Sequence, residues 1–293
     1  MSRVACLIAA LWLGACVTPP ATQYPESPVK FPNEAVEFYR PSNLKQTILY
    51  RPARGEPPFP AVVLAHTCGG VGGHIYDWAR RLTAAGYVVL IVDGLSPRNV
   101  ANNCLPAWQA TVSVDAYNGD IVAGLAHLRS LSFVKPDALG VAGYSFGAIA
   151  SAKLTSPSYR QRFGFEVDGL KAIAFFYAPC GTSSQNLMQR ATYDWPTDPA
   201  IPLIAFLGAS DNESPPATCV AAAERLKAQG RPVAYKVYPD TTHSFDDPFN
   251  GTGGRQIYHG TRGPFLYRYN PEATEDAWRE MKALFDRELR SAK

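Results

Sequence analysis

The pentapeptide Gly143-Tyr144-Ser145-Phe146-Gly147 is the part of the sequence best suited to chemistry. It lies between an apolar run typical of a strand and a run typical of a helix. In this setting a Gly-x-Ser-x-Gly sequence forms a sharp, strained turn, and its glycines keep the turn free of side-chain clashes. The serine hydroxyl then stands beside a helix N-terminus, whose N–H groups suit a developing oxyanion. The pattern predicts that Ser145 is a nucleophile.

A serine hydroxyl becomes a good nucleophile only when a base accepts its proton. Among the five histidines, His243 lies in the loop after the last predicted strand, where such a base is expected. His259 is the reserve candidate. His127 falls within an amphipathic stretch and is expected to be structural, whereas His66 ends a buried strand and is expected to organise the next loop.

The base in turn needs a carboxylate that fixes its tautomer and stabilises the imidazolium. Asp211 directly follows the apolar run 201–207 and is our choice, with Glu213 as the alternative. The resulting order Ser145, Asp211, His243 fits the α/β-hydrolase type of serine hydrolase and not the other known orders.

A serine site of this kind also needs two N–H donors for the oxyanion. The backbone of Phe146, the residue after the nucleophile, is expected to supply one. The loop 66–70 follows an earlier strand at the same edge of the sheet, and Thr67 and Cys68 are its expected donors. No metal ion or organic cofactor is required by this chemistry.

Strand and helix patterns alternate from residue 46 onward. Short apolar or alternating runs predict strands at 46–51, 61–65, 87–92, 138–143, 170–177, 201–207 and 232–238. Helical spacing and capping residues predict helices at 75–85, 106–130, 146–154, 214–230 and from Asn270 to about residue 289. Repeated β-α units predict one α/β-hydrolase domain over residues 35–293, with a mostly parallel central sheet and helices on both faces.

The overall composition is that of a globular chain with a sizeable core. Apolar residues make up 46% of the 293 residues and charged residues 18%. The net charge is only +3, and the basic residues are dispersed, so nucleic acid is not an expected partner.

The N-terminus resembles a bacterial lipoprotein leader. Arg3 precedes the apolar run 4–15, which is too short for a typical transmembrane helix. Small residues then lead to Cys16, the expected lipidation site, although an ordinary signal peptide with an incidental Cys16 is the alternative. Residues 1–15 would be the signal peptide and 16–34 a tether. Because Val17 is not an inner-membrane retention residue, we expect a periplasm-facing lipoprotein of the cell envelope, attached to the outer membrane.

Export would place the other cysteines in an oxidising compartment. Apart from Cys6 and Cys16, four of the six cysteines remain: Cys68, Cys104, Cys180 and Cys219. They allow three pairings. A zinc site is the other interpretation, but the chain has no C-x-x-C pair, so disulfides are favoured.

The segments around these residues resemble the dienelactone hydrolase family. The matching pieces are AVVLAHTCGG (61–70), DWARRLTAAGYVVLIVD (77–93), GVAGYSFGA (140–148), YAPCG (177–181), LGASDNESPPATC (207–219) and YPDTTHSFD (238–246). The resemblance implies a site at the carboxyl edge of the sheet and the pairs Cys68–Cys104 and Cys180–Cys219. The type enzymes use a cysteine nucleophile where this chain has Ser145, and many relatives have glycine at Thr67. The resemblance therefore implies hydrolase chemistry and leaves the substrate open.

The leading hypothesis is a serine hydrolase acting on a small ester or lactone. A peptidase or a cell-wall carbohydrate esterase with the same triad is the second, because substrate choice depends on rim loops. A non-catalytic envelope lipoprotein that keeps the fold for binding is the third. The segment 245–269 is either a substrate-binding flap or a long irregular connection.

Overall fold

The computed structural model describes residues 27–35, 47–104, 110–180 and 194–290. Its centre is a seven-stranded sheet in the order β1-β3-β2-β4-β5-β6-β7. The strands are β1 (Ile48–Tyr50), β2 (Phe59–Ala65), β3 (Val88–Val92), β4 (Val134–Tyr144), β5 (Leu170–Phe176), β6 (Leu203–Gly208) and β7 (Val233–Tyr238). β1 is antiparallel to β3, and every other neighbouring pair is parallel.

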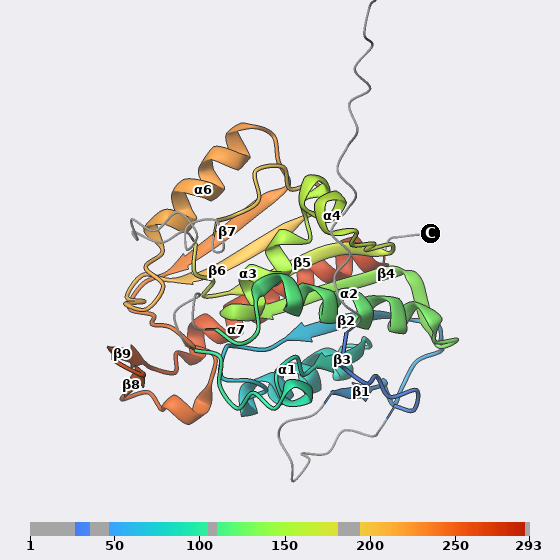
Figure 1. The fold of residues 1–293 in the computed structure, drawn as a ribbon, viewed down its shortest axis with the longest axis horizontal. Coiled ribbons are helices and arrows are strands. Elements are labelled where there is room, and N and C mark those ends of the chain that lie inside the picture. The colour runs from blue at the N-terminus through green and yellow to red at the C-terminus, as the bar shows by residue number, and fades with distance from the viewer. Residues whose placement is uncertain (1–26, 36–46, 105–109, 181–193, 291–293) are drawn as a thin grey trace, which may run out of the picture.

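Helices cover both faces of this sheet. They are α1 (Gly73–Ala84), α2 (Val114–Ser130), α3 (Phe146–Lys153), α4 (Pro157–Phe163), α6 (Ala217–Ala228) and α7 (Pro271–Phe285), the last continuing into a π-helical turn at Asp286–Arg290. In Figure 1, α2 and α3 lie in front of the sheet and α7 lies behind it. The predicted single α/β domain with a mostly parallel sheet is confirmed.

Strand β2 illustrates why the sheet must be covered on both sides. Ala61, Val63 and Ala65 pack into the core beneath α2 and α3. Val62 and Leu64 point the other way and pack into the core beneath α1 and α7. Because alternate side chains of a strand face opposite sides, an uninterrupted apolar run is stable only between two layers of helices.

Helix α2 is shorter than the sequence predicts. The expected helix spans 106–130, but α2 begins at Val114, where the Ser113 side chain accepts a hydrogen bond from the Ala116 N–H at 3.0 Å. Just before this cap, Asn103 bonds both the N–H and the carbonyl of Val112. These side-chain bonds occupy both backbone groups of Val112, which competes with helix formation at this residue. The first residues of the expected helix, 106–109, lie outside the described residues.

Helix α6 also begins later than expected. The pair Ser214-Pro215 predicts a cap and first turn, whereas α6 starts at Ala217. The N–H groups of Glu213 and Ser214 donate instead to the carboxylate of Asp211, at 2.9 and 2.7 Å. The turn is therefore organised around Asp211 rather than around the helix N-terminus.

The segment 245–269 contains a regular hairpin. Strands β8 (Arg255–His259) and β9 (Arg262–Tyr267) pair antiparallel as a separate two-stranded sheet. Asn212 joins this hairpin to the domain, since its side chain accepts from Leu266 N at 3.0 Å and donates to Pro264 O at 3.2 Å. Figure 1 shows the hairpin beyond the ends toward which the parallel strands point.

The expected signal peptide and lipidation site at Cys16 lie outside the described residues. The last part of the expected tether packs on the domain: Val29 is buried, and the Ser27 hydroxyl donates to Asp120 at 2.6 Å. In the described part of the chain, no helix has both the length and the apolar character needed to cross a membrane.

Gly208, at the end of β6, should tolerate no side chain. A Cβ atom there would lie 2.3 Å from the carbonyl oxygen of Thr241, whereas one at Gly253 would meet nothing within 4 Å. We expect Gly208→Ala to lower the free energy of unfolding by about 1–3 kcal/mol because the backbone must shift. Urea denaturation measures this, with Gly253→Ala as the matched control; equal stability of the two variants would contradict the expectation.

Candidate active site

Ser145 occupies a strained turn between β4 and α3. It occupies the N-cap position of α3, and its backbone angles are φ 50° and ψ −108°, a conformation that a residue with a side chain rarely adopts. The Ser145 N–H donates to the Phe176 carbonyl at 3.0 Å, and its own carbonyl accepts from Ala148 N at 3.0 Å. These bonds hold the turn so that Ser145 stands at the carboxyl end of β4.

The two glycines of the pentapeptide are required by close packing. A Cβ at Gly143 would lie 2.4 Å from the carbonyl oxygen of Gly147, and one at Gly147 would lie 2.2 Å from that of Ala65. The start of α3 therefore rests directly on the end of β2. The Gly147 N–H donates to the His66 carbonyl at 3.1 Å, which fixes this contact.

Ser145, His243 and Asp211 meet from separate loops. The Nε2 atom of His243 lies 3.1 Å from Ser145 Oγ, and its Nδ1 lies 2.8 Å from Asp211 Oδ2. All three residues are buried, with exposed fractions of 8% for Ser145, 2% for His243 and 4% for Asp211. The structure thus brings together the predicted nucleophile, base and acid, in the connectivity that proton transfer from the hydroxyl requires.

Asp211 is fixed on both of its oxygens. Oδ1 accepts the N–H groups of Glu213 and Ser214, and Oδ2 faces His243. The turn that carries it is held against the loop of His243, because the Ser210 N–H donates to the Thr241 carbonyl at 2.9 Å. The carboxylate is therefore rigid and turned toward the imidazole.

Charges around His243 favour its protonated form. Burial by itself lowers the pKa of a histidine, but the carboxylates of Asp211 and Glu213, with a smaller contribution from Asp246, raise the pKa of His243 to about 9. An imidazolium formed by accepting the proton of Ser145 would be stabilised in this environment.

The loop expected to supply oxyanion donors lies beside Ser145 and is well braced. The His66 ring donates from Nδ1 to the Thr67 carbonyl at 2.6 Å and accepts the Gly94 N–H on Nε2 at 3.0 Å. Burial lowers the pKa of His66, which agrees with a neutral ring in this role. His66 thus organises the loop, and Phe146, as the first residue of α3, has a backbone N–H with no acceptor inside the helix. That Thr67, Cys68 and Phe146 donate to an oxyanion stays a prediction.

Two disulfides brace the rim of this site. The bonds join Cys68 to Cys104 and Cys180 to Cys219, the two pairs that the resemblance implies. The first ties the loop of Thr67 to the chain that leads toward α2, and the Asn103 N–H adds a hydrogen bond of 2.8 Å to the Cys68 carbonyl. In the described ranges, no group of three or more His, Cys, Asp or Glu side chains could hold a metal ion.

The other candidate residues have different partners. His259 lies on β8, 3.3 Å from Glu213 Oε1, and among the described contacts it does not reach Ser145. Glu213 pairs with His259 and with the Tyr267 hydroxyl rather than with His243. His127 bonds the Pro32 carbonyl at 2.9 Å, a structural role as expected.

The sequence does not single out three residues that lie near His243, namely Tyr177, Tyr267 and Asp246, and it indicates a fourth, Glu213, only as the alternative acid. The rings of Tyr177 and Tyr267 lie against the His243 ring, with centroids 4.7 and 5.2 Å away. Asp246 and Glu213 accept the hydroxyls of these two tyrosines. Two of these four residues have a usable signal in the sequence: Tyr177 opens the YAPCG segment, and Asp246 closes the YPDTTHSFD segment, three residues after His243.

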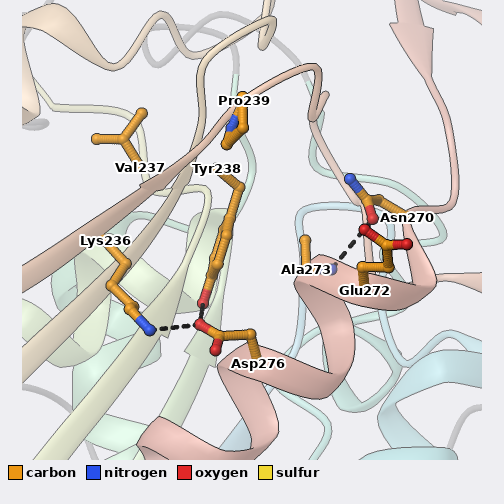
Figure 2. A pocket seen from close by; sticks show the side chains of 8 residues that line it. All are labelled: Lys236, Val237, Tyr238, Pro239, Asn270, Glu272, Ala273 and Asp276. Atoms are coloured by element: carbon orange, nitrogen blue, oxygen red, sulfur yellow. Dashed lines mark hydrogen bonds and ion pairs between the residues drawn. The ribbon is translucent and has the colours of Figure 1, made fainter.

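A pocket between β7 and α7 contains none of the triad candidates (Figure 2). It is lined by Lys236, Val237, Tyr238, Pro239, Asn270, Glu272, Ala273 and Asp276. The Asp276 carboxylate already binds the Lys236 ammonium and the Tyr238 hydroxyl, both at close range. These polar groups satisfy one another, so the pocket presents no convergent chemistry of its own.

Comparisons with known proteins find relatives of the same fold. A candidate carboxymethylenebutenolidase of Methylorubrum extorquens is 23% identical over 240 residues, covering 80% of this chain and 74% of the relative. The solved structure of a dienelactone hydrolase-like promiscuous phosphotriesterase, P91, from metagenomic libraries has a TM-score of 0.59 at 19% identity and covers 82% of this chain and 91% of its own. Esterase Est2 of Thermogutta terrifontis has a TM-score of 0.56 at 16% identity, covering 84% and 90%.

The family assignment comes from a model that spans most of the domain. The model of the dienelactone hydrolase family matches residues 46–289, which include the whole central sheet and the strained serine turn. The chain belongs to the dienelactone hydrolase family of α/β hydrolases.

Proposed function

We propose that this protein is a serine hydrolase that cleaves a small carboxylic ester or lactone with Ser145, His243 and Asp211 as its triad. The observation that carries the proposal is the buried chain of contacts from Ser145 Oγ through the His243 ring to Asp211, at 3.1 and 2.8 Å. The strained backbone of Ser145 supports it, because such strain is concentrated at functional sites.

The reaction proceeds in two halves. Ser145 Oγ attacks the carbonyl carbon while His243 Nε2 takes the hydroxyl proton, and the resulting imidazolium gives that proton to the leaving alcohol. Water then attacks the acyl-enzyme with His243 as base, and the acid is released as Ser145 recovers its proton. Asp211 keeps Nδ1 protonated, so that Nε2 is the free acceptor.

Backbone amides stabilise the charge that develops on the carbonyl oxygen. Phe146 at the start of α3 supplies one N–H, and the loop of Thr67 and Cys68 supplies the other. The Gly147–His66 hydrogen bond of 3.1 Å supports this assignment, because it holds the loop against the start of α3. The Cys68–Cys104 disulfide keeps the loop from moving away during turnover.

Family membership and the proposed nucleophile support a choice of substrate class. The relatives described above carry names of a lactone hydrolase, a phosphotriesterase and an esterase, and all three reactions displace an alcohol or enol from an electrophilic centre. A serine ester intermediate suits small carboxylic esters and lactones. We propose these as substrates of this chain, with a free small molecule as the partner and no cofactor.

Replacing the nucleophile tests the proposal directly. We expect Ser145→Ala to abolish labelling by a fluorophosphonate probe and to lower kcat/KM for p-nitrophenyl acetate by about 10³-fold or more, because no acyl-enzyme can form. Ser151→Ala is a matched control, since Ser151 is a buried serine on α3 that bonds only the backbone. Undiminished turnover by Ser145→Ala would refute the proposal.

The pH dependence follows from the charge state of His243. Only the neutral ring can accept the proton of Ser145, and its pKa is raised to about 9 by the neighbouring carboxylates. Below that value, kcat/KM should rise tenfold per pH unit, and it should level off above it. The profile for a fluorogenic ester is therefore expected to have its acid limb well above 6.5, the ordinary histidine value. A midpoint at or below 6.5 would contradict this expectation.

We further propose that Cys16 anchors the protein to the cell envelope. The leader and the small residues before Cys16 support lipidation, and the stretch that follows would tether the domain. Cys16→Ser should release the protein from the membrane fraction on cell fractionation, whereas Cys6→Ser should not. Retention of the Cys16→Ser protein in membranes would contradict the anchor.

A further inference from the structure

Two tyrosine rings contact the imidazole of His243, and each tyrosine is hydrogen-bonded to a carboxylate. The ring of Tyr177 lies 4.7 Å from the His243 ring, and its hydroxyl donates to Asp246 at 2.8 Å. The ring of Tyr267 lies 5.2 Å away, and its hydroxyl donates to Glu213. The triad hydrogen bonds fix the two ring nitrogens, and these tyrosine rings restrict the rest of the ring.

The pair of Tyr177 and Asp246 is part of the core. Tyr177 directly follows β5, and Asp246 also accepts the Trp78 indole N–H from α1 at 2.7 Å. All three residues are at most 3% exposed. The Tyr177 side of the His243 ring is therefore held in place by the buried core of the domain.

The pair of Tyr267 and Glu213 depends on the β8–β9 hairpin. Tyr267 is the last residue of β9, and a backbone bridge links it to His243. His259 on β8 lies 3.3 Å from Glu213 Oε1 and 3.2 Å from the Tyr267 hydroxyl. Arg262 approaches the same carboxylate at 3.8 Å. The hairpin thus surrounds Glu213 with donors.

Glu213 carries a negative charge close to the base. Its side chain is only 9% exposed, and burial alone would raise the pKa of its carboxyl, but the charges of His243 and His259 lower that pKa to about 2. Tyr267 holds Oε2 and His259 faces Oε1, so Glu213 does not compete with Asp211 for Nδ1. Asp211 therefore binds the His243 ring directly, whereas Glu213 binds Tyr267 and His259.

We propose that Glu213 and Tyr267 are positioning residues of the triad: the hairpin holds the Glu213 carboxylate beside His243, where it stabilises the imidazolium, while the Tyr267 ring fixes the imidazole plane. The inference deepens the proposed function and rests on it. Among the described residues, the charged and titratable groups around His243 are Asp211 and Glu213 after β6, Asp246 on its own loop, Tyr177 after β5 and Tyr267 on β9.

A titration of His243 by NMR tests the charge without any turnover. It uses the full-length protein with Ser145→Ala, in which the imidazole signals are followed against pH with and without Glu213→Gln. We expect the His243 pKa to fall by roughly one unit when the charge is removed, since a nearby opposite charge shifts a pKa by that order. Glu288→Gln is the matched control, because Glu288 pairs with Arg287 in the π-helical turn after α7. An unchanged pKa in Glu213→Gln would overturn the electrostatic role.

Kinetics with Tyr267→Phe tests the positioning. This variant keeps the ring and the Glu213 charge but removes the hydroxyl that holds Oε2. We expect kcat for p-nitrophenyl acetate to fall about three- to tenfold, the effect of one lost hydrogen bond, with KM unchanged. Tyr258→Phe on the same hairpin is the control, because Tyr258 is 63% exposed. Equal kcat values for the two variants, or a loss confined to KM, would overturn the positioning role.

The two proposals fail in different ways. A wild-type protein that is not labelled by the fluorophosphonate and turns over no ester would refute the proposed function. The NMR titration would still show whether Glu213 acts on His243. Normal ester turnover with no effect of Glu213→Gln on the His243 pKa would leave the triad intact and refute this inference alone.

Discussion

The backbone-to-backbone contact between the start of α3 and the end of β2 is the constraint on which the site depends. Gly147 lies so close to the Ala65 carbonyl that a Cβ would come within 2.2 Å of the oxygen. This contact sets the turn at Ser145 and places the loop of His66 and Thr67 beside it. A similar contact, between Gly208 and Thr241, brings the turn of Asp211 to the loop of His243. The ends of β2 and β4, and those of β6 and β7, can approach so closely because a glycine stands at each contact.

Burial makes the electrostatics of this site strong. His243 and Asp211 are almost fully enclosed, where an unpaired charge would be costly and a paired one interacts strongly. The fold meets this by giving each carboxylate its own donors: backbone N–H groups for Asp211, a tyrosine and a histidine for Glu213, and a tryptophan and a tyrosine for Asp246. The consequence is a histidine whose protonated form is favoured, which suits a base that must hold a proton between two steps.

The rim of the site is built from parts that the parallel sheet does not supply. The Cys68–Cys104 bond braces the loop of the expected oxyanion donors, and the Cys180–Cys219 bond ties the chain after β5 to α6. The β8–β9 hairpin, which follows His243 in the chain, completes the surroundings of this residue through the bridge from Tyr267. Family membership accounts for the sheet and the serine turn. The disulfides and the hairpin are the parts of this chain that would determine its substrate specificity.

The sequence by itself determined the elements and the order of the candidate site, because apolar periodicity and the Gly-x-Ser-x-Gly spacing are local properties of the chain. It predicted the parallel sheet, and it selected Ser145, Asp211 and His243 from loops that follow strands. It misjudged the starts of α2 and α6, where Asn103 binds both backbone groups of Val112 and Asp211 binds the N–H groups of Glu213 and Ser214. Only the tertiary structure decided that Glu213 faces Tyr267 and His259, since residues some 50 positions apart meet there through packing that no local pattern encodes.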